Sequence, residues 1–141
     1  MTTHSLTSPP AGATLSPSTY RRVGAVFAGL FAVFAVTTAT DIVLHATRVY
    51  PEWGPNMSDA LYGLAAAYRV AYGVLGGYVT ARFAPDKPMA HAFALGLVGV
   101  ALSAIGCAVM WGVGPVWYPL AVMATALPCS LAGGRLFRGR A

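Results

Sequence analysis

Four apolar windows dominate this chain, and each is long enough to cross a lipid bilayer as a helix. They cover residues 23–44, 60–83, 89–111 and 116–137, and a spanning helix needs about 20 apolar residues. Of all residues, 57% are hydrophobic and 9% are charged, whereas soluble domains carry roughly a quarter charged residues. The sequence therefore predicts an all-α integral membrane protein whose four transmembrane helices form two antiparallel hairpins.

The chain divides into two regions by composition. Residues 1–19 are rich in Ser, Thr and Pro, cannot bury a core, and are predicted to be a disordered tail. Residues 20–141 form the predicted transmembrane domain. In its loops, Asn56 and Asp86 are predicted N-caps of the second and third helices, and Pro88 suits the first turn of the third. Pro128 lies inside the fourth helix and should kink it.

The positions of the basic residues predict the orientation. One side would hold the first flank, the second loop and the last flank, with seven basic residues: Arg21, Arg22, Arg82, Lys87, Arg135, Arg138 and Arg140. The other side would hold only Arg48. The positive-inside rule then places both termini in the cytoplasm, in a bacterial-type inner membrane. A cleaved signal peptide is the less favoured alternative for the first window, since no small-x-small site follows it.

Arg69 is the most unusual residue of the apolar windows, because a charge at that depth is costly unless it has a partner. The one carboxylate inside another window is Asp41. Side chains of helices lean toward the N-terminus of their own helix, so in antiparallel helices these two lean toward each other. His45 lies one turn beyond Asp41 on the same face. We expect a polar cluster of Asp41, His45 and Arg69 between the first two helices.

This cluster has three interpretations. The favoured one is a structural ion pair that holds the first two helices together. The second is a proton or ion relay, or an anion-binding site. In the third the residues do not meet, and Arg69 pairs with a lipid head group or another subunit.

Small residues line one face of the second and third helices. They are predicted to let helices pack closely within one molecule, with self-association as the alternative. The set comprises Gly73, Gly76, Gly77, Gly96, Gly99, Ser103 and Gly106. A weak internal repeat is also visible, since Gly76-Gly77 recurs as Gly133-Gly134 and Trp53-Gly54 as Trp111-Gly112. It suggests two hairpins related as parallel repeats.

The sequence lacks motifs for most kinds of chemistry. It has no CxxC or Cys/His metal-ligand pattern, and His45 and His91 would lie near opposite membrane surfaces, so neither zinc nor haem is expected. No phosphate loop or nucleophile elbow occurs. The basic residues flank apolar windows and form no soluble face, which argues against nucleic acid as a partner. We expect no cofactor and no enzymatic activity.

The expected function follows from these exclusions. The first expectation is a non-enzymatic accessory or assembling subunit, with the lipid bilayer and either copies of itself or a larger membrane complex as partners. The alternative is a small proton- or ion-coupled transporter or channel that uses Asp41, His45 and Arg69. A third hypothesis is an intramembrane enzyme whose pocket is lined by aromatic and acidic residues of the outer loops.

Overall fold

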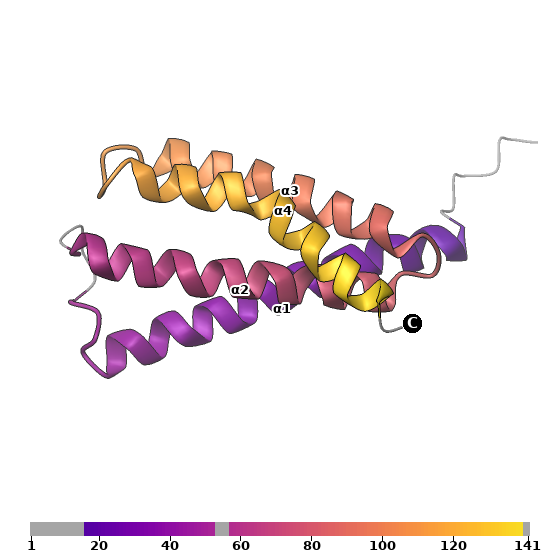
Figure 1. The fold of residues 1–141 in the computed structure, drawn as a ribbon, viewed down its shortest axis with the longest axis horizontal. Coiled ribbons are helices and arrows are strands. Elements are labelled where there is room, and N and C mark those ends of the chain that lie inside the picture. Colours follow the sequence, from indigo (N-terminus) through magenta and orange to yellow (C-terminus); the bar gives the residue numbers. More distant parts are fainter. Residues whose placement is uncertain (1–15, 53–56, 140–141) are drawn as a thin grey trace, which may run out of the picture.

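The computed structural model describes residues 16–52 and 57–139, which form four helices (Figure 1). They are α1 (Pro17–Ala46), α2 (Asp59–Phe83), α3 (Pro88–Val109) and α4 (Trp117–Arg138). Successive helices run in opposite directions, so α1 begins and α4 ends at the same end of the bundle (Figure 1). We call this the basal end and the opposite one the distal end.

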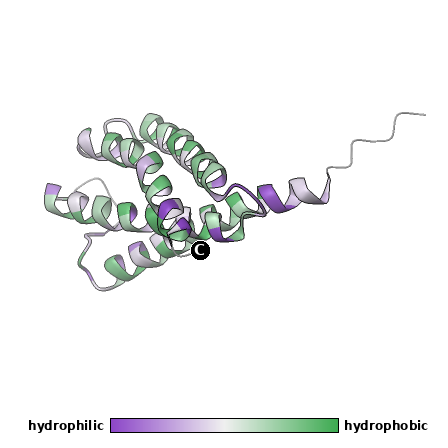
Figure 2. Ribbon diagram, turned by 45° about the vertical axis from the view of Figure 1, so that its right-hand side comes forward, coloured by the Kyte–Doolittle hydropathy of each residue, from purple (hydrophilic) through white to green (hydrophobic). Residues whose placement is uncertain are grey.

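Three of the four helices, α1, α3 and α4, are long and apolar enough to cross a membrane. Hydrophobic residues run along the helices, and hydrophilic ones gather at the start of α1 (Figure 2). The prediction of a membrane-protein fold is consistent with these three helices. Helix α2 has 25 residues, but Arg69 and its tyrosines and glycines lower its mean hydropathy.

The helix ends differ from the prediction in two places. Helix α1 begins at Pro17, because the Ser16 side chain accepts a hydrogen bond from the Thr19 amide. Residues 17–19, predicted to belong to the tail, are therefore helical, and residues 1–15 lie outside the described residues. The N-cap of α3 is Lys87, with φ of 39°, so the prediction for Asp86 is wrong. Asp86 instead forms an ion pair with Arg22, 2.7 Å away.

Asn56 lies outside the described residues, and Ser58 occupies the N-cap position of α2. Pro88 begins α3 as predicted. Pro128 lies in the interior of α4, which changes direction about midway along its length (Figure 1).

The basal half is held together by very close approach of α2 and α4. A Cβ added to Gly77 would overlap the backbone of Ser130, and one added to Gly133 would overlap the carbonyl oxygen of Val74. At the same level the Ser130 hydroxyl donates a 2.6 Å hydrogen bond to the carbonyl oxygen of Ala92 in α3. No side chain fits between α2 and α4 here, so glycine is required for this crossing.

The glycine pairs do not occupy equivalent environments. Gly76 faces α1, its partner within the first hairpin, whereas Gly133 faces α2 of the other hairpin. In turn Gly77 faces α4, while Gly134 faces Ala92 and Met89 of α3. Parallel repeats would give the first glycine of each pair the same surroundings. These environments are exchanged, so the glycines give no support to the internal repeat.

The distal half is more open than the basal half. Among the described residues, α2 and α3 each contact all three other helices, whereas α1 and α4 do not contact each other. Most buried residues, such as Ala25, Ala81 and Ala92, belong to the basal half of the bundle. The two helix pairs spread apart toward the distal end (Figure 1).

The glycine crossing leads to a stability prediction. Gly77→Ala should lower the free energy of unfolding by about 2 kcal/mol, a typical cost of overpacking, because its Cβ overlaps the α4 backbone. The matched control is Gly106→Ala, since a Cβ there meets nothing within 4 Å. Unfolding midpoints of both variants in detergent check the prediction. Equal midpoints would contradict the close crossing.

Candidate functional site

An ion pair between Asp41 and Arg69 forms the centre of the candidate site. Arg69 Nη2 lies 2.9 Å from Asp41 Oδ2, and the two side chains are 26% and 24% exposed, respectively. Asp41 lies near the distal end of α1, and Arg69 lies ten residues into α2, so the pair joins the first two helices in the distal half. The structure thus brings together two residues that the sequence paired through their height and direction.

Tyr68 completes the arrangement as a third member. Its hydroxyl donates to Asp41 Oδ1 and accepts a 2.8 Å hydrogen bond from Arg69 Nη1. Arg69 Nη1 also donates to the carbonyl oxygen of Ala65, 3.3 Å away. Both oxygens of the Asp41 carboxylate therefore have a donor. Sequence reasoning missed Tyr68, because neighbouring residues of a helix point in directions about 100° apart.

The loop after α1 extends this network toward the distal surface. Tyr50 is buried, and its hydroxyl lies 3.4 Å from the Tyr68 hydroxyl and 3.5 Å from the Leu61 carbonyl oxygen. His45 Nδ1 lies 2.8 Å from the main-chain carbonyl oxygen of Asp41. The imidazole ring packs edge-on against Tyr50, with centroids 5.3 Å apart. All three predicted cluster residues thus lie in one connected region.

Helix α4 contributes an aromatic side chain to the same region. The guanidinium carbon of Arg69 lies 5.0 Å from the centroid of the Tyr68 ring and 5.9 Å from that of Tyr118, within the range of cation–π attraction. Tyr118 also packs against Tyr62, with centroids 5.1 Å apart. Arg69 therefore interacts with α1 through charge and with α4 through an aromatic face.

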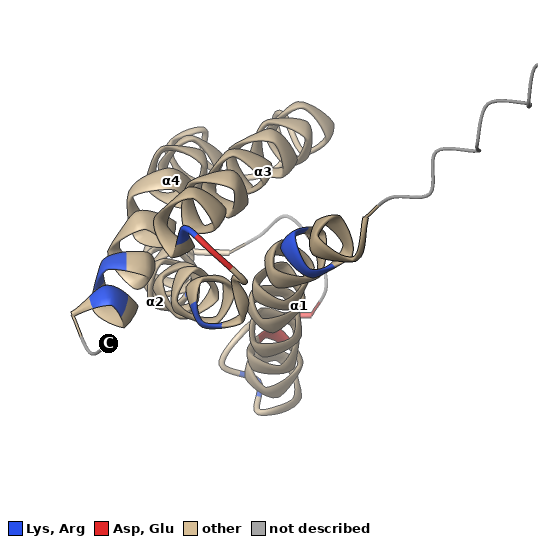
Figure 3. Cartoon of the chain, turned by 90° about the vertical axis from the view of Figure 1, so that its right-hand side faces the viewer, with Lys and Arg blue, Asp and Glu red and all other residues tan. Residues whose placement is uncertain are grey.

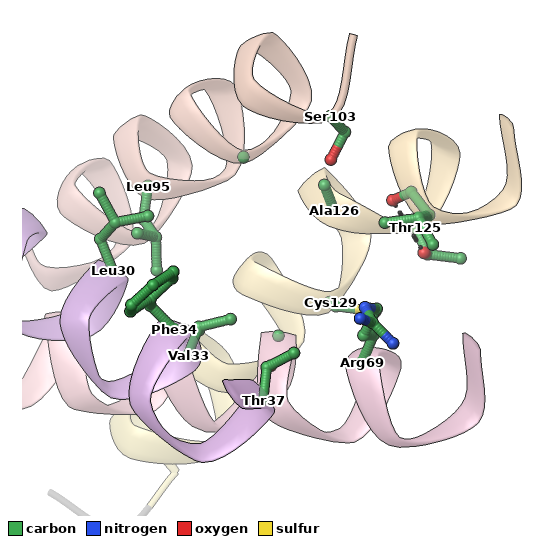
Figure 4. A pocket seen from close by; sticks show the side chains of 13 residues that line it. Leu30, Val33, Phe34, Thr37, Arg69, Leu95, Ser103, Thr125, Ala126 and Cys129 are labelled. Atoms are coloured by element: carbon green, nitrogen blue, oxygen red, sulfur yellow. Dashed lines mark hydrogen bonds between the residues drawn. The ribbon is translucent and has the colours of Figure 1, made fainter. Parts of the chain in front are cut away.

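A cavity of about 260 Å³ adjoins Arg69 (Figure 4). All four helices contribute to its walls, which are mostly apolar, and Thr37, Ser103 and Thr125 add hydroxyl groups. The remaining lining residues are Leu30, Val33, Phe34, Gly73, Leu95, Gly99, Val122, Ala126 and Cys129. The cavity was not foreseen from the sequence.

The predicted packing residues fall into three groups. Gly76, Gly77 and Gly96 are buried and leave no room for a Cβ. Gly73 and Gly99 are less tight, since their added Cβ atoms would lie 3.1 Å from Cys129 and 3.3 Å from Ala126. Ser103 lines the cavity instead of filling a contact, and Gly106 has open space around it.

The described residues include no group of three or more His, Cys, Asp or Glu side chains placed to hold a metal ion. Cys107 and Cys129 are buried and not bonded to each other. The carboxylate of Asp41 is occupied by a guanidinium and a phenol. The geometry is that of a neutralised charge pair beside an apolar cavity.

Comparison of the chain with protein-family models, with curated proteins and with solved structures found no match.

A charge-removal cycle tests the role of the ion pair. Asp41→Ala and Arg69→Ala should each lower the folded yield in membranes, because each leaves one charge without its partner, at a cost of about 3 kcal/mol. The double variant should recover much of that loss, since it removes both charges. Yield and monodispersity after extraction measure the effect.

The hydroxyl of Tyr68 provides the control for this cycle. Tyr68→Phe keeps both charges and the ring and removes only the hydroxyl, with its hydrogen bonds to Asp41, Arg69 and Tyr50, so its loss should be smaller than that of either charge variant. Additive losses in the double variant would show that the two charges do not stabilise each other.

Proposed function

We propose that the chain is a four-span inner-membrane protein in which α2 is the fourth spanning helix. At 1.5 Å per residue its 25 residues extend about 37 Å, more than the roughly 30 Å of a hydrocarbon core. Its polar content faces protein, because Arg69 and Tyr68 bond to Asp41 of α1 and Gly77 packs against Ser130 of α4. Between residues 61 and 80 its exposed large side chains, Leu64, Val70 and Leu75, are apolar. These contacts with neighbouring helices thus account for its low hydropathy.

The charge distribution supports cytoplasmic termini. Lysine and arginine residues occur around the basal end of the bundle (Figure 3), where Arg22 of α1 pairs with Asp86 of the loop after α2. In the sequence of the two distal loops, residues 47–58 and 110–116, Arg48 is the one basic residue. By the positive-inside rule the basal end, with both termini, faces the cytoplasm.

Site-specific labelling tests this topology. In a background with Cys107 and Cys129 replaced by alanine, a cysteine at Lys87 should react with a membrane-impermeant maleimide only after the cell membrane is opened. A cysteine at Arg48 should react in intact cells. Reaction of both cysteines in intact cells, or of neither, would contradict a spanning α2.

For its role, we propose a non-enzymatic subunit of a larger membrane assembly. The main supporting observation is that Asp41, Arg69 and Tyr68 bond to one another and give both oxygens of the Asp41 carboxylate a donor, as expected of a group that holds helices together. The connecting loops are short, so the surfaces offered to a partner are mostly within the membrane. One such surface is a row on α1 at helical spacing, where Phe27 and Phe31 are 64% and 71% exposed.

Extraction in a mild detergent at native expression tests the subunit proposal. The chain should migrate well above the mass of its own 14.6 kDa in native gels, bound to copies of itself or another membrane protein. Replacing Phe27 and Phe31 together by alanine should release it, because the aromatic row is lost.

The matched control is the double replacement of Leu102 and Ile105 by alanine. These side chains are also exposed, at 50% and 60%, but lie on α3. A lone monomer in all three preparations would count against an assembling role, and equal release by both double variants would count against the α1 surface.

A proton- or ion-coupled transporter is the second candidate, favoured by the cavity that reaches Arg69. A relay needs a charge that can change during a cycle, whereas a structural pair needs both charges permanently. The charge-removal cycle separates them. If Asp41→Ala and Arg69→Ala both fold as well as the parent chain, the structural role fails and the relay is favoured.

A further inference from the structure

The cavity beside Arg69 has one open side. Its walls come from all four helices, and it lies where the α1–α2 pair and the α3–α4 pair spread apart toward the distal end (Figure 1). Phe34 stands on the wall contributed by α1 and is 68% exposed. In the proposed topology this open side faces the hydrocarbon of the bilayer, so molecules dissolved in the membrane have access to it.

Hydrogen-bond donors without an acceptor lie on these apolar walls. The guanidinium of Arg69 has five N–H bonds, and its described bonds go to Asp41, Tyr68 and Ala65 through Nη1 and Nη2. Its Nε–H and one Nη2–H have no acceptor among the described residues. The Ser103 hydroxyl, directed toward the cavity in Figure 4, likewise has no described partner. By contrast, Thr125 donates to carbonyl oxygens of its own helix.

The depth of Arg69 limits which molecules can supply the missing acceptor. Arg69 lies ten residues after the start of α2, or about 15 Å along the helix. In a hydrocarbon core of about 30 Å this places it well inside the apolar region. Phospholipid head groups stay at the interface, and their acyl chains carry no acceptor. The occupant must therefore bring an oxygen deep into the membrane and must itself be largely apolar.

The charges beside the cavity further limit which ligand can bind there. Asp41 already neutralises Arg69 at 2.9 Å, so an anion would be repelled by the carboxylate as well as attracted by the guanidinium. A neutral acceptor such as a carbonyl oxygen avoids the repulsion by the Asp41 carboxylate. The volume of about 260 Å³ corresponds to roughly nine waters of the liquid, which suits a single ring with its substituents. A longer tail would extend through the open side.

We propose that this cavity binds the head group of a neutral, tailed carbonyl compound of the isoprenoid-quinone class. Arg69 and Ser103 donate hydrogen bonds to its carbonyl oxygens, the apolar walls contact the ring, and the tail lies in the hydrocarbon beside the opening between the α1–α2 pair and the α3–α4 pair. This inference does not depend on the subunit role, because it concerns a ligand site that an isolated chain would retain.

Binding of decylubiquinone to the full chain in phospholipid nanodiscs tests the proposal. Partition is measured between loaded and empty nanodiscs, with decylbenzene as a probe that has the tail and ring but no carbonyl. We expect one saturable site per chain for decylubiquinone and at least tenfold weaker binding of decylbenzene. Equal binding of the two probes, or no saturable excess over empty nanodiscs, would overturn the proposal.

Two neighbouring residues of α3 supply matched variants. Ser103→Phe fills the cavity and removes a donor, so it should weaken binding at least tenfold. Leu102→Phe makes a similar change on an exposed position outside the lining and should leave binding unchanged. Should Ser103→Phe not fold, Ser103→Ala, which removes only the hydroxyl, is expected to weaken binding severalfold. Equal affinities of the Ser103 and Leu102 variants would overturn the site.

A competition arm distinguishes a neutral from an anionic ligand. Cardiolipin added to the nanodiscs should leave decylubiquinone binding unchanged if the acceptor is a neutral carbonyl. Stoichiometric displacement by cardiolipin would overturn the proposal in favour of an anionic head group on Arg69.

Discussion

The cost of placing charge among apolar helices explains the arrangement of the distal half of this bundle. A guanidinium within hydrocarbon needs a carboxylate and further hydrogen bonds, and Arg69 obtains them from Asp41, Tyr68 and Ala65. These contacts fix both the spacing and the register of α1 against α2. A further hydrogen bond joins the same helices between the hydroxyl groups of Thr40 and Tyr72, 2.8 Å apart.

The two halves of the molecule are stabilised by different forces. At the base, glycines allow backbones to approach closely, and dispersion contacts and a Ser130 hydrogen bond hold the helices. In the distal half, α2 and α4 interact through aromatic rings such as Tyr62 and Tyr118. Large rings keep backbones farther apart than glycines do, and α4 bends near Pro128. The cavity lies where close packing gives way to this wider spacing.

Much of the helical organisation was predictable from the sequence, because hydrophobic length and helix-breaking residues are local signals. The approach of Asp41 and Arg69 also followed from helical rise and side-chain direction. The roles of Tyr68, Tyr50 and Tyr118 did not, since they depend on how far long side chains reach between helices and from a loop. The open surroundings of Gly106 and the cavity likewise depend on the divergence of helices, which no local pattern encodes.

The Asp41–Arg69 pair also has a consequence for the order of events during synthesis. The two residues are 28 positions apart, so the Asp41 carboxylate emerges from the ribosome before Arg69 does. In the proposed topology, each of these helices alone would carry an unpaired charge into lipid. We therefore expect α1 and α2 to enter the bilayer together. Helices α3 and α4 have no buried charge and face no such requirement. The first hairpin would then be the inserted template on which the second one assembles.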